Sequence, residues 1–210
     1  MDEYEKHTKK IPSNVQIVLA PSLPDLMFFS NRYMDKKTHP QTFLGVQDIS
    51  SFPAGAYTGA VCSRNLEGFH VSYAIIGHSE RRRYFHETNG EVAGKIREAL
   101  AASIIPVVCV TRDSILSQAN AIETSDRKRV VVAFEPIDHI GTGIADTLED
   151  ILEARKLVKE AFGDVPYIYG GSIDTKTDTE LLNHKDIDGF LVGNACLNAE
   201  AFAQLIQLIQ

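Results

Sequence analysis

The chain has 210 residues, of which 44% are apolar and 23% are charged, as is typical of a soluble globular protein with a sizeable core. Its formal charge of −7 gives no reason to expect nucleic acid or an anionic membrane as a partner. No run of residues approaches a membrane span, and the three widely spaced cysteines form no metal-type pair. We therefore expect a cytoplasmic protein.

Strand and helix patterns alternate along the chain. Apolar runs bounded by proline, glycine or polar residues predict seven strands, at residues 15–20, 42–46, 73–77, 104–110, 130–135, 167–169 and 189–192. Helical patterns lie at residues 2–10, 23–34, 63–69, 91–101, 114–122, 147–162 and 199–209, and 147–162 is the clearest amphipathic one. No linker interrupts the series, which predicts one parallel α/β domain over residues 1–210. Seven strands leave an open doubly wound sheet possible beside a closed barrel, which needs about eight.

The most informative stretch is residues 130–143. Its apolar strand ends on Glu135, and Pro136 prevents the strand from continuing. A loop that closes with Gly141-Thr142-Gly143 follows. A carboxylate at the C-terminal end of a buried parallel strand lies where a barrel enzyme places its catalytic residues. Taken alone, the stretch is equally well interpreted as an acidic residue that ends a strand in solvent.

Three other strand ends carry polar or glycine-rich segments. His78 follows the third strand, Gly170-Gly171-Ser172 follows the sixth, and Gly193-Asn194 follows the last. Paired glycines let backbone N–H groups approach an anion closely, and in a barrel the loops after the last two strands bind phosphate. Each segment alone has a simpler interpretation, as a core histidine or as ordinary turns.

Together the segments form an ordered set. The set comprises Ala-Pro-Ser-Leu-Pro at 20–24, Gly-Ala-Tyr-Thr-Gly at 55–59, Ile-Gly-His-Ser-Glu-Arg-Arg at 76–82, Val-Val-Cys-Val at 107–110, Phe-Glu-Pro-Ile at 134–137, Ile-Gly-Thr-Gly at 140–143, Tyr-Gly-Gly-Ser at 169–172 and Asp-Gly-Phe-Leu-Val-Gly at 188–193. In this order and spacing the chain resembles the triosephosphate isomerase family, from about Val15 to the C-terminus. The resemblance implies a TIM (β/α)8-type barrel that interconverts dihydroxyacetone phosphate and glyceraldehyde 3-phosphate with no cofactor and no metal.

The resemblance also implies roles for individual residues. Glu135 would move a proton between two substrate carbons, and neutral His78 would polarise the carbonyl group. Glu80 would support the histidine, and Ser79 would orient the resting base. The substrate phosphate would be held by Gly141, Ser172, Gly193 and Asn194. The loop over residues 136–145 would close over the intermediate and exclude water. The loop Gly55–Gly59 would reach into a partner subunit, so that a homodimer is expected.

The chain departs from the family pattern in several places. The family opens with a strand that carries an Asn-x-Lys motif, whose lysine lies beside the substrate, whereas this sequence starts in what is predicted to be the first helix. We therefore expect a barrel that lacks or replaces its first strand. Asp138 stands where the family has a tryptophan, Asn194 where it has a glycine, and Ala60 where it has an acidic residue.

These departures leave four hypotheses open at the level of sequence. The chain is a triosephosphate isomerase with a shortened scaffold, or a catalytically impaired homologue that binds a phosphorylated ligand or needs a partner strand. The third hypothesis is a half-open barrel whose exposed edges recruit a strand from another chain or from its own dimer mate. The fourth hypothesis is that the sequence start omits the first strand of a normal enzyme.

Overall fold

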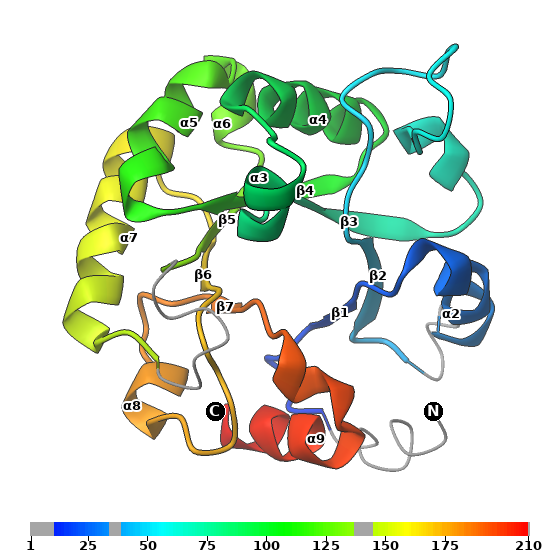
Figure 1. The fold of residues 1–210 in the computed structure, drawn as a ribbon. Helices are drawn as coiled ribbons and strands as arrows, with labels where there is room; N and C mark the ends of the chain where they lie inside the picture. The colour runs from blue at the N-terminus through cyan, green and yellow to red at the C-terminus, as the bar shows by residue number, and fades with distance from the viewer. Residues whose placement is uncertain (1–10, 34–38, 137–144, 210) are drawn as a thin grey trace.

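The computed structural model describes residues 11–33, 39–136 and 145–209, and it shows a curled parallel sheet with helices on its outer side (Figure 1). The sheet has seven strands in the order β1 to β7. They are β1 Ile17–Leu19, β2 Thr42–Val46, β3 Val71–Ile76, β4 Ile105–Val110, β5 Val131–Phe134, β6 Tyr167–Tyr169 and β7 Gly189–Phe190. Every neighbouring pair is parallel. Because a doubly wound sheet reverses its strand order at a switch point, this uninterrupted order is that of a barrel.

Among the described residues, β1 and β7 form the two edges of the sheet, and each pairs with one neighbour. The described part is thus a TIM-type barrel with seven of the about eight strands that close such a fold. The predicted fold class is confirmed. At the β1 edge, Val18 is 40% exposed although its strand neighbour Ile17 is buried.

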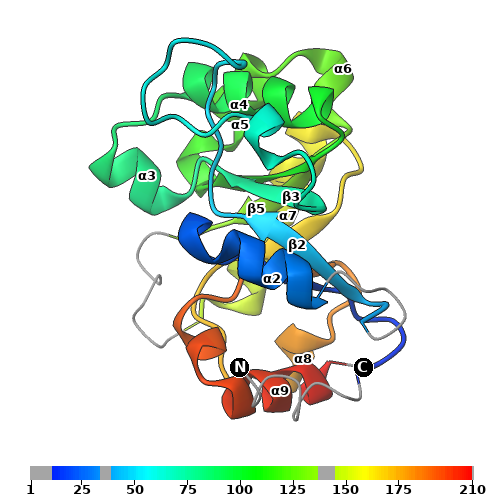
Figure 2. The ribbon, with the colours of Figure 1, turned by 90° about the vertical axis from the view of Figure 1, so that its right-hand side faces the viewer.

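The α-helices are α2 Leu26–Tyr33, α3 Ser79–Tyr84, α4 Asn89–Ala101, α5 Ile115–Ala121, α6 Thr124–Arg127, α7 Leu148–Phe162, α8 Thr179–Leu182 and α9 Ala199–Leu208. In the described ranges, four 3-10 turns accompany them: η1 Leu23–Asp25, η2 Ser63–Leu66, η3 Arg112–Ser114 and η5 Asn194–Leu197. Viewed from the side, α4 and α5 lie at one end of the molecule and α8 and α9 at the other, while α3 projects from the edge of the barrel (Figure 2). No helix in the described part is long and apolar enough to cross a membrane.

The sequence prediction failed for the shortest elements. Helices α3, α6 and α8 were not predicted, because four to six residues are too few to show a helical period. Local caps stabilise two of them, since the His78 side chain accepts from Glu80 N and the Asp178 side chain accepts from Glu180 N. The helix predicted at 63–69 was wrong in extent, as only η2 forms there, and the last strand is shorter than predicted. The helix predicted at 2–10 lies outside the described residues.

Apolar residues form two layers, one on each face of the strands. The larger layer lies between the sheet and the helices and includes Leu44, Ile76 and Phe134. The smaller layer lies inside the curl, where Val107, Cys109 and Ala133 pack together. Neighbouring residues of a strand point to opposite faces, so both layers draw on the same strands.

Helix α7 begins and ends where its sequence predicts. Thr147 caps its start by accepting a hydrogen bond from Asp150 N at 3.1 Å, and Gly163 ends it with φ +92°. The buried face is made of Ile151, Ala154, Val158 and Phe162, at spacings of three and four residues. Leu157, expected near this face, is instead 39% exposed.

Candidate active site

Glu135 and His78 meet at the C-terminal edge of the sheet. Glu135 directly follows β5, and its backbone N donates to Val110 O at 2.8 Å, which extends the pairing with β4 by one residue. His78 follows β3 after Gly77 and caps α3. The distance between His78 Nε2 and Glu135 Oε1 is 2.9 Å. Ser79 N donates to the other carboxylate oxygen, Oε2, also at 2.9 Å. The structure therefore brings three of the predicted site residues into contact.

The Glu135 carboxylate is withdrawn from solvent, with only 1% of the residue exposed. Gly170 permits this placement, because a Cβ added there would lie 3.1 Å from Glu135 Cγ. The buried Cys109 thiol also lies beside the carboxylate, and burial together with the negative charge of Glu135 raises the pKa of Cys109 well above its usual value. A buried carboxylate in contact with a histidine is an arrangement typical of an acid–base site rather than of a strand end in solvent.

The hydrogen bonds of His78 define the tautomer of its neutral imidazole. Glu80 N donates to Nδ1 at 3.3 Å, so Nδ1 carries a lone pair and the proton of the neutral ring lies on Nε2. Nε2, which carries this proton, lies 2.9 Å from Glu135 Oε1. The hydrogen bond with Glu135 raises the pKa of His78 above its ordinary value, and burial opposes that rise. The Glu80 carboxylate adds a smaller contribution, as its Oε2 lies 3.8 Å from Nδ1 and its side chain is 71% exposed.

The predicted phosphate-binding residues follow neighbouring strands at the same sheet edge. Ser172 comes three residues after the end of β6, and Gly193 and Asn194 come after β7. Gly193 precedes η5 and is exposed together with Asn194. Because β5, β6 and β7 are consecutive in the sheet, these loops follow the same edge as Glu135, and Gly170 at the start of the β6 loop packs against Glu135. Gly141 and Asp138 lie outside the described residues. Within the described ranges, no group of three or more His, Cys, Asp or Glu side chains could hold a metal ion.

A family model described as triosephosphate isomerase matches residues 1–209. The chain belongs to the triosephosphate isomerase family. The triosephosphate isomerase of Mesomycoplasma hyopneumoniae strain 7448 is 36% identical, over 97% of this chain and 87% of that protein. That of Mesomycoplasma hyorhinis is 37% identical over 98% of the chain and 87% of that protein. That of Herminiimonas arsenicoxydans is 40% identical over 78% of the chain and 75% of that protein.

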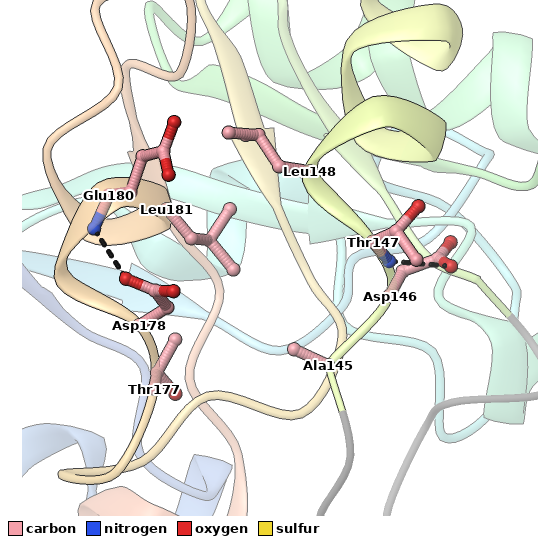
Figure 3. Close-up of a pocket in the computed structure, with 8 residues that line it drawn as sticks. All are labelled: Ala145, Asp146, Thr147, Leu148, Thr177, Asp178, Glu180 and Leu181. Carbon is pink, nitrogen blue, oxygen red and sulfur yellow. Dashed lines mark hydrogen bonds between the residues drawn. The ribbon is translucent and has the colours of Figure 1, made fainter.

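A cavity of about 240 Å³ lies between the start of α7 and α8 (Figure 3). Asp146 and Thr147 line one side, and Asp178 and Glu180 line the other (Figure 3). Two of the three carboxylates accept backbone hydrogen bonds, Asp146 from Thr147 N and Asp178 from Glu180 N. A wall with three carboxylates repels an anion, so this cavity is a poor site for a phosphate group.

Two residues shape this edge of the isomerase fold, and sequence reasoning missed the role of Tyr169. Tyr169, at the end of β6, accepts a hydrogen bond from Asp146 N at 2.8 Å, which joins β6 to the segment that precedes α7. Gly171 must lack a side chain, because a Cβ there would lie 2.0 Å from the Tyr169 hydroxyl oxygen. The paired glycines were a signal for close approach in this loop. Only the tertiary structure shows that the approaching group at Gly171 is the Tyr169 hydroxyl.

Proposed function

We propose that this chain interconverts dihydroxyacetone phosphate and glyceraldehyde 3-phosphate. One observation carries the proposal. A buried glutamate at the end of β5 and a histidine at the end of β3 lie 2.9 Å apart in a barrel of the triosephosphate isomerase family. Isomerisation moves hydrogen between two neighbouring carbons and between the oxygens they carry, so that acid–base groups suffice and no redox cofactor takes part.

In the proposed reaction Glu135 accepts a proton from the carbon next to the substrate carbonyl. The electrons of that C–H bond form the C=C bond of an enediolate, and the carbonyl oxygen takes up the negative charge. The hydroxyl proton on the deprotonated carbon then passes to this oxygen, and Glu135 returns its proton to the former carbonyl carbon, while the other oxygen becomes the new carbonyl oxygen. The Ser79 backbone N–H holds the resting carboxylate, and Glu80 is assigned a supporting role beside the imidazole.

His78 is proposed to stabilise the negative oxygen as a neutral donor. Its Nδ1 already accepts from Glu80 N, so Nε2–H is the remaining donor of the ring, and it lies at the Glu135 carboxylate. A neutral imidazole donates a hydrogen bond without giving up its proton to the carboxylate beside it. The mechanism therefore requires His78 to be uncharged at the working pH.

The phosphate is proposed to bind to backbone N–H groups after β6 and β7, near Ser172, Gly193 and Asn194, with Gly141 from the preceding loop. This proposal rests on the glycine-rich loops and on their place at the end of the barrel strands. The family carries a lysine in its first strand. Lys95, the buried lysine of the described residues, does not replace it. Its ammonium group is bound to Asp48 and Glu87.

We also propose that the chain forms a homodimer and acts in the cytoplasm, in glycolysis and gluconeogenesis. The loop that contains Gly55–Gly59 presents Phe52 and Tyr57, which are about half exposed and stack with centroids 4.6 Å apart. Helix α3 presents Tyr84 and Phe85, which are 64% and 66% exposed. Aromatic groups exposed in this way are enriched at interfaces. Sedimentation should give a dimer that Tyr57→Asp weakens, and a monomer at every concentration would contradict this proposal.

The deciding experiment is a coupled assay with glyceraldehyde 3-phosphate on the wild-type chain, Glu135→Ala and His78→Gln. We expect turnover that Glu135→Ala abolishes and His78→Gln lowers by about 10²-fold or more. Circular dichroism establishes that each protein is folded. A folded wild-type chain without turnover would overturn the isomerase proposal and favour the alternative of a catalytically impaired homologue. Binding of inorganic phosphate, followed by calorimetry, then tests whether that homologue keeps a phosphorylated ligand.

A further inference from the structure

The guanidinium group of Arg82 holds the peptide that precedes the site histidine. Arg82 lies on α3, and its Nε donates to Gly77 O at 2.8 Å. Its Nη1 donates to Asn89 Oδ1 at 2.9 Å, and its Nη2 donates to Gln118 Oε1 at 2.7 Å. One planar cation thus connects the end of β3 with the start of α4 and with α5. Because the fork is rigid, the direction of each bond constrains the other two.

Gln118 is a fully buried polar side chain, with none of its surface exposed. It lies on α5 between the buried core residues Ile115 and Ala119. Its Nε2 donates to Asn89 O at 3.3 Å, while its Oε1 accepts from Arg82. An amide in an apolar layer is destabilising unless both of its ends are bonded. One hydrogen bond of Gln118 thus goes to Arg82, which holds Gly77. The other goes to Asn89, which also binds Arg82.

The turn at Gly77 transmits a displacement of Arg82 directly to His78. Gly77 has φ +73°, and a Cβ placed there would lie 2.9 Å from Val92 Cγ2 and 3.0 Å from Arg82 Nη2. The space beside the Gly77 Cα is therefore already filled by Val92 and Arg82. A shift of the guanidinium group moves the Gly77 carbonyl and, through the next peptide, the imidazole that faces Glu135.

We propose that Arg82 and Gln118 are positioning residues for His78, which hold its Nε2 against the Glu135 carboxylate. This inference rests on the proposed isomerase function for its kinetic consequences. Its geometric consequence, the contact between His78 and Glu135, is independent of turnover. The bond to Gln118 is the most informative to remove, because Gln118 touches neither His78 nor Glu135 in the described hydrogen bonds.

The test replaces Gln118 by methionine, which has a similar volume and no hydrogen-bonding amide. A misplaced reacting group slows chemistry more than it weakens binding, so we expect kcat to fall about tenfold with KM changed less than about twofold. Gln118→Glu keeps an acceptor for Arg82 and should recover most of that loss. Should Gln118→Met fail to fold, Asn89→Ala removes a bond at a less buried position and should lower kcat about threefold.

A second measurement follows the His78 imidazole by NMR during a pH titration. The contact with Glu135 raises the pKa of His78, so that loosening the contact in Gln118→Met should move that pKa down toward its ordinary value. Ser30→Ala is the matched control, because Ser30 Oγ is also a buried donor, to Phe69 O at 2.9 Å, on the distant helix α2. This control should lower stability and leave kcat and the His78 titration unchanged.

The outcomes separate this inference from the proposed function. If Gln118→Met loses stability as Ser30→Ala does while kcat and the His78 titration stay at wild-type values, the positioning role is overturned. If the wild-type chain has no turnover, the isomerase proposal fails, and the NMR titration still decides whether Gln118 holds the imidazole against Glu135.

Discussion

Replacing Lys95 by methionine should strongly destabilise the fold, because it removes the cation at the centre of a buried charge network. Lys95 lies on α4 and is 5% exposed. Its Nζ lies 2.6 Å from Asp48 Oδ1 and also contacts Glu87 Oε1. Arg81 contacts the same two carboxylates, with Nη2 2.9 Å from Asp48 Oδ2. Without Lys95, two carboxylates that lie near each other share a single cation.

The magnitude follows from burial. Removing one partner of a buried ion pair typically costs about 3–5 kcal/mol, because the remaining charge is left in a poorly solvated place. Here the expected loss is at the lower end, about 3 kcal/mol, since Arg81 stays in place and water reaches the Asp48 side chain, which is 22% exposed. For a chain of this size, that loss lowers Tm by about 6–12 °C.

The assay is urea unfolding followed by far-UV circular dichroism, at a fixed protein concentration. Lys159→Met is the matched control, because Lys159 Nζ also pairs with a carboxylate, Asp164 Oδ1 at 3.3 Å, but the two side chains are 64% and 78% exposed. Exposed pairs contribute at most about 1 kcal/mol. Glu87→Gln in the Lys95→Met background should recover part of the lost stability, since it removes one of the two carboxylates that would otherwise share Arg81. If Lys95→Met lowers the urea midpoint no more than Lys159→Met does, the buried network does not stabilise the fold.

Three further predictions follow from the site and its surroundings. Because the pKa of His78 is raised and neutral His78 is the proposed donor, kcat/KM should fall on the acid side with a midpoint above about 6.5. The same shift stabilises the fold below about pH 6.5, and this stability is lost as pH rises through the raised pKa; His78→Gln should abolish both effects. Tyr169→Phe leaves Asp146 N–H without its acceptor and should lower the free energy of unfolding by about 1–2 kcal/mol in urea, and an unchanged midpoint would contradict this. His86→Gly should raise Tm by about 1–2 °C, because His86 is exposed at φ +56°, where a side chain is strained; a lower Tm would refute that argument.

The sequence predicts long elements well and short ones poorly, for a physical reason. Strands such as β4 and β5 are runs of apolar residues bounded by polar ones, and α7 repeats its buried face over four turns. Such patterns report burial directly. Helix α3 has six residues, five of them polar or charged. It forms because His78 caps it and because Arg82 and Arg81 bond to Gly77 and Asp48, which lie outside the helix. No local pattern carries that information.

By itself the sequence determined the parallel α/β class, the strand ends that carry the candidate site, and the family resemblance, because these depend on the order of local patterns. Only the tertiary structure decided that Glu135 is buried and lies 2.9 Å from His78 Nε2, since this distance depends on how β3, β4 and β5 pair and on their register. It also decided that Gln118 on α5 faces Arg82. Contacts between distant segments arise from packing, so the residue pattern within one segment does not predict them.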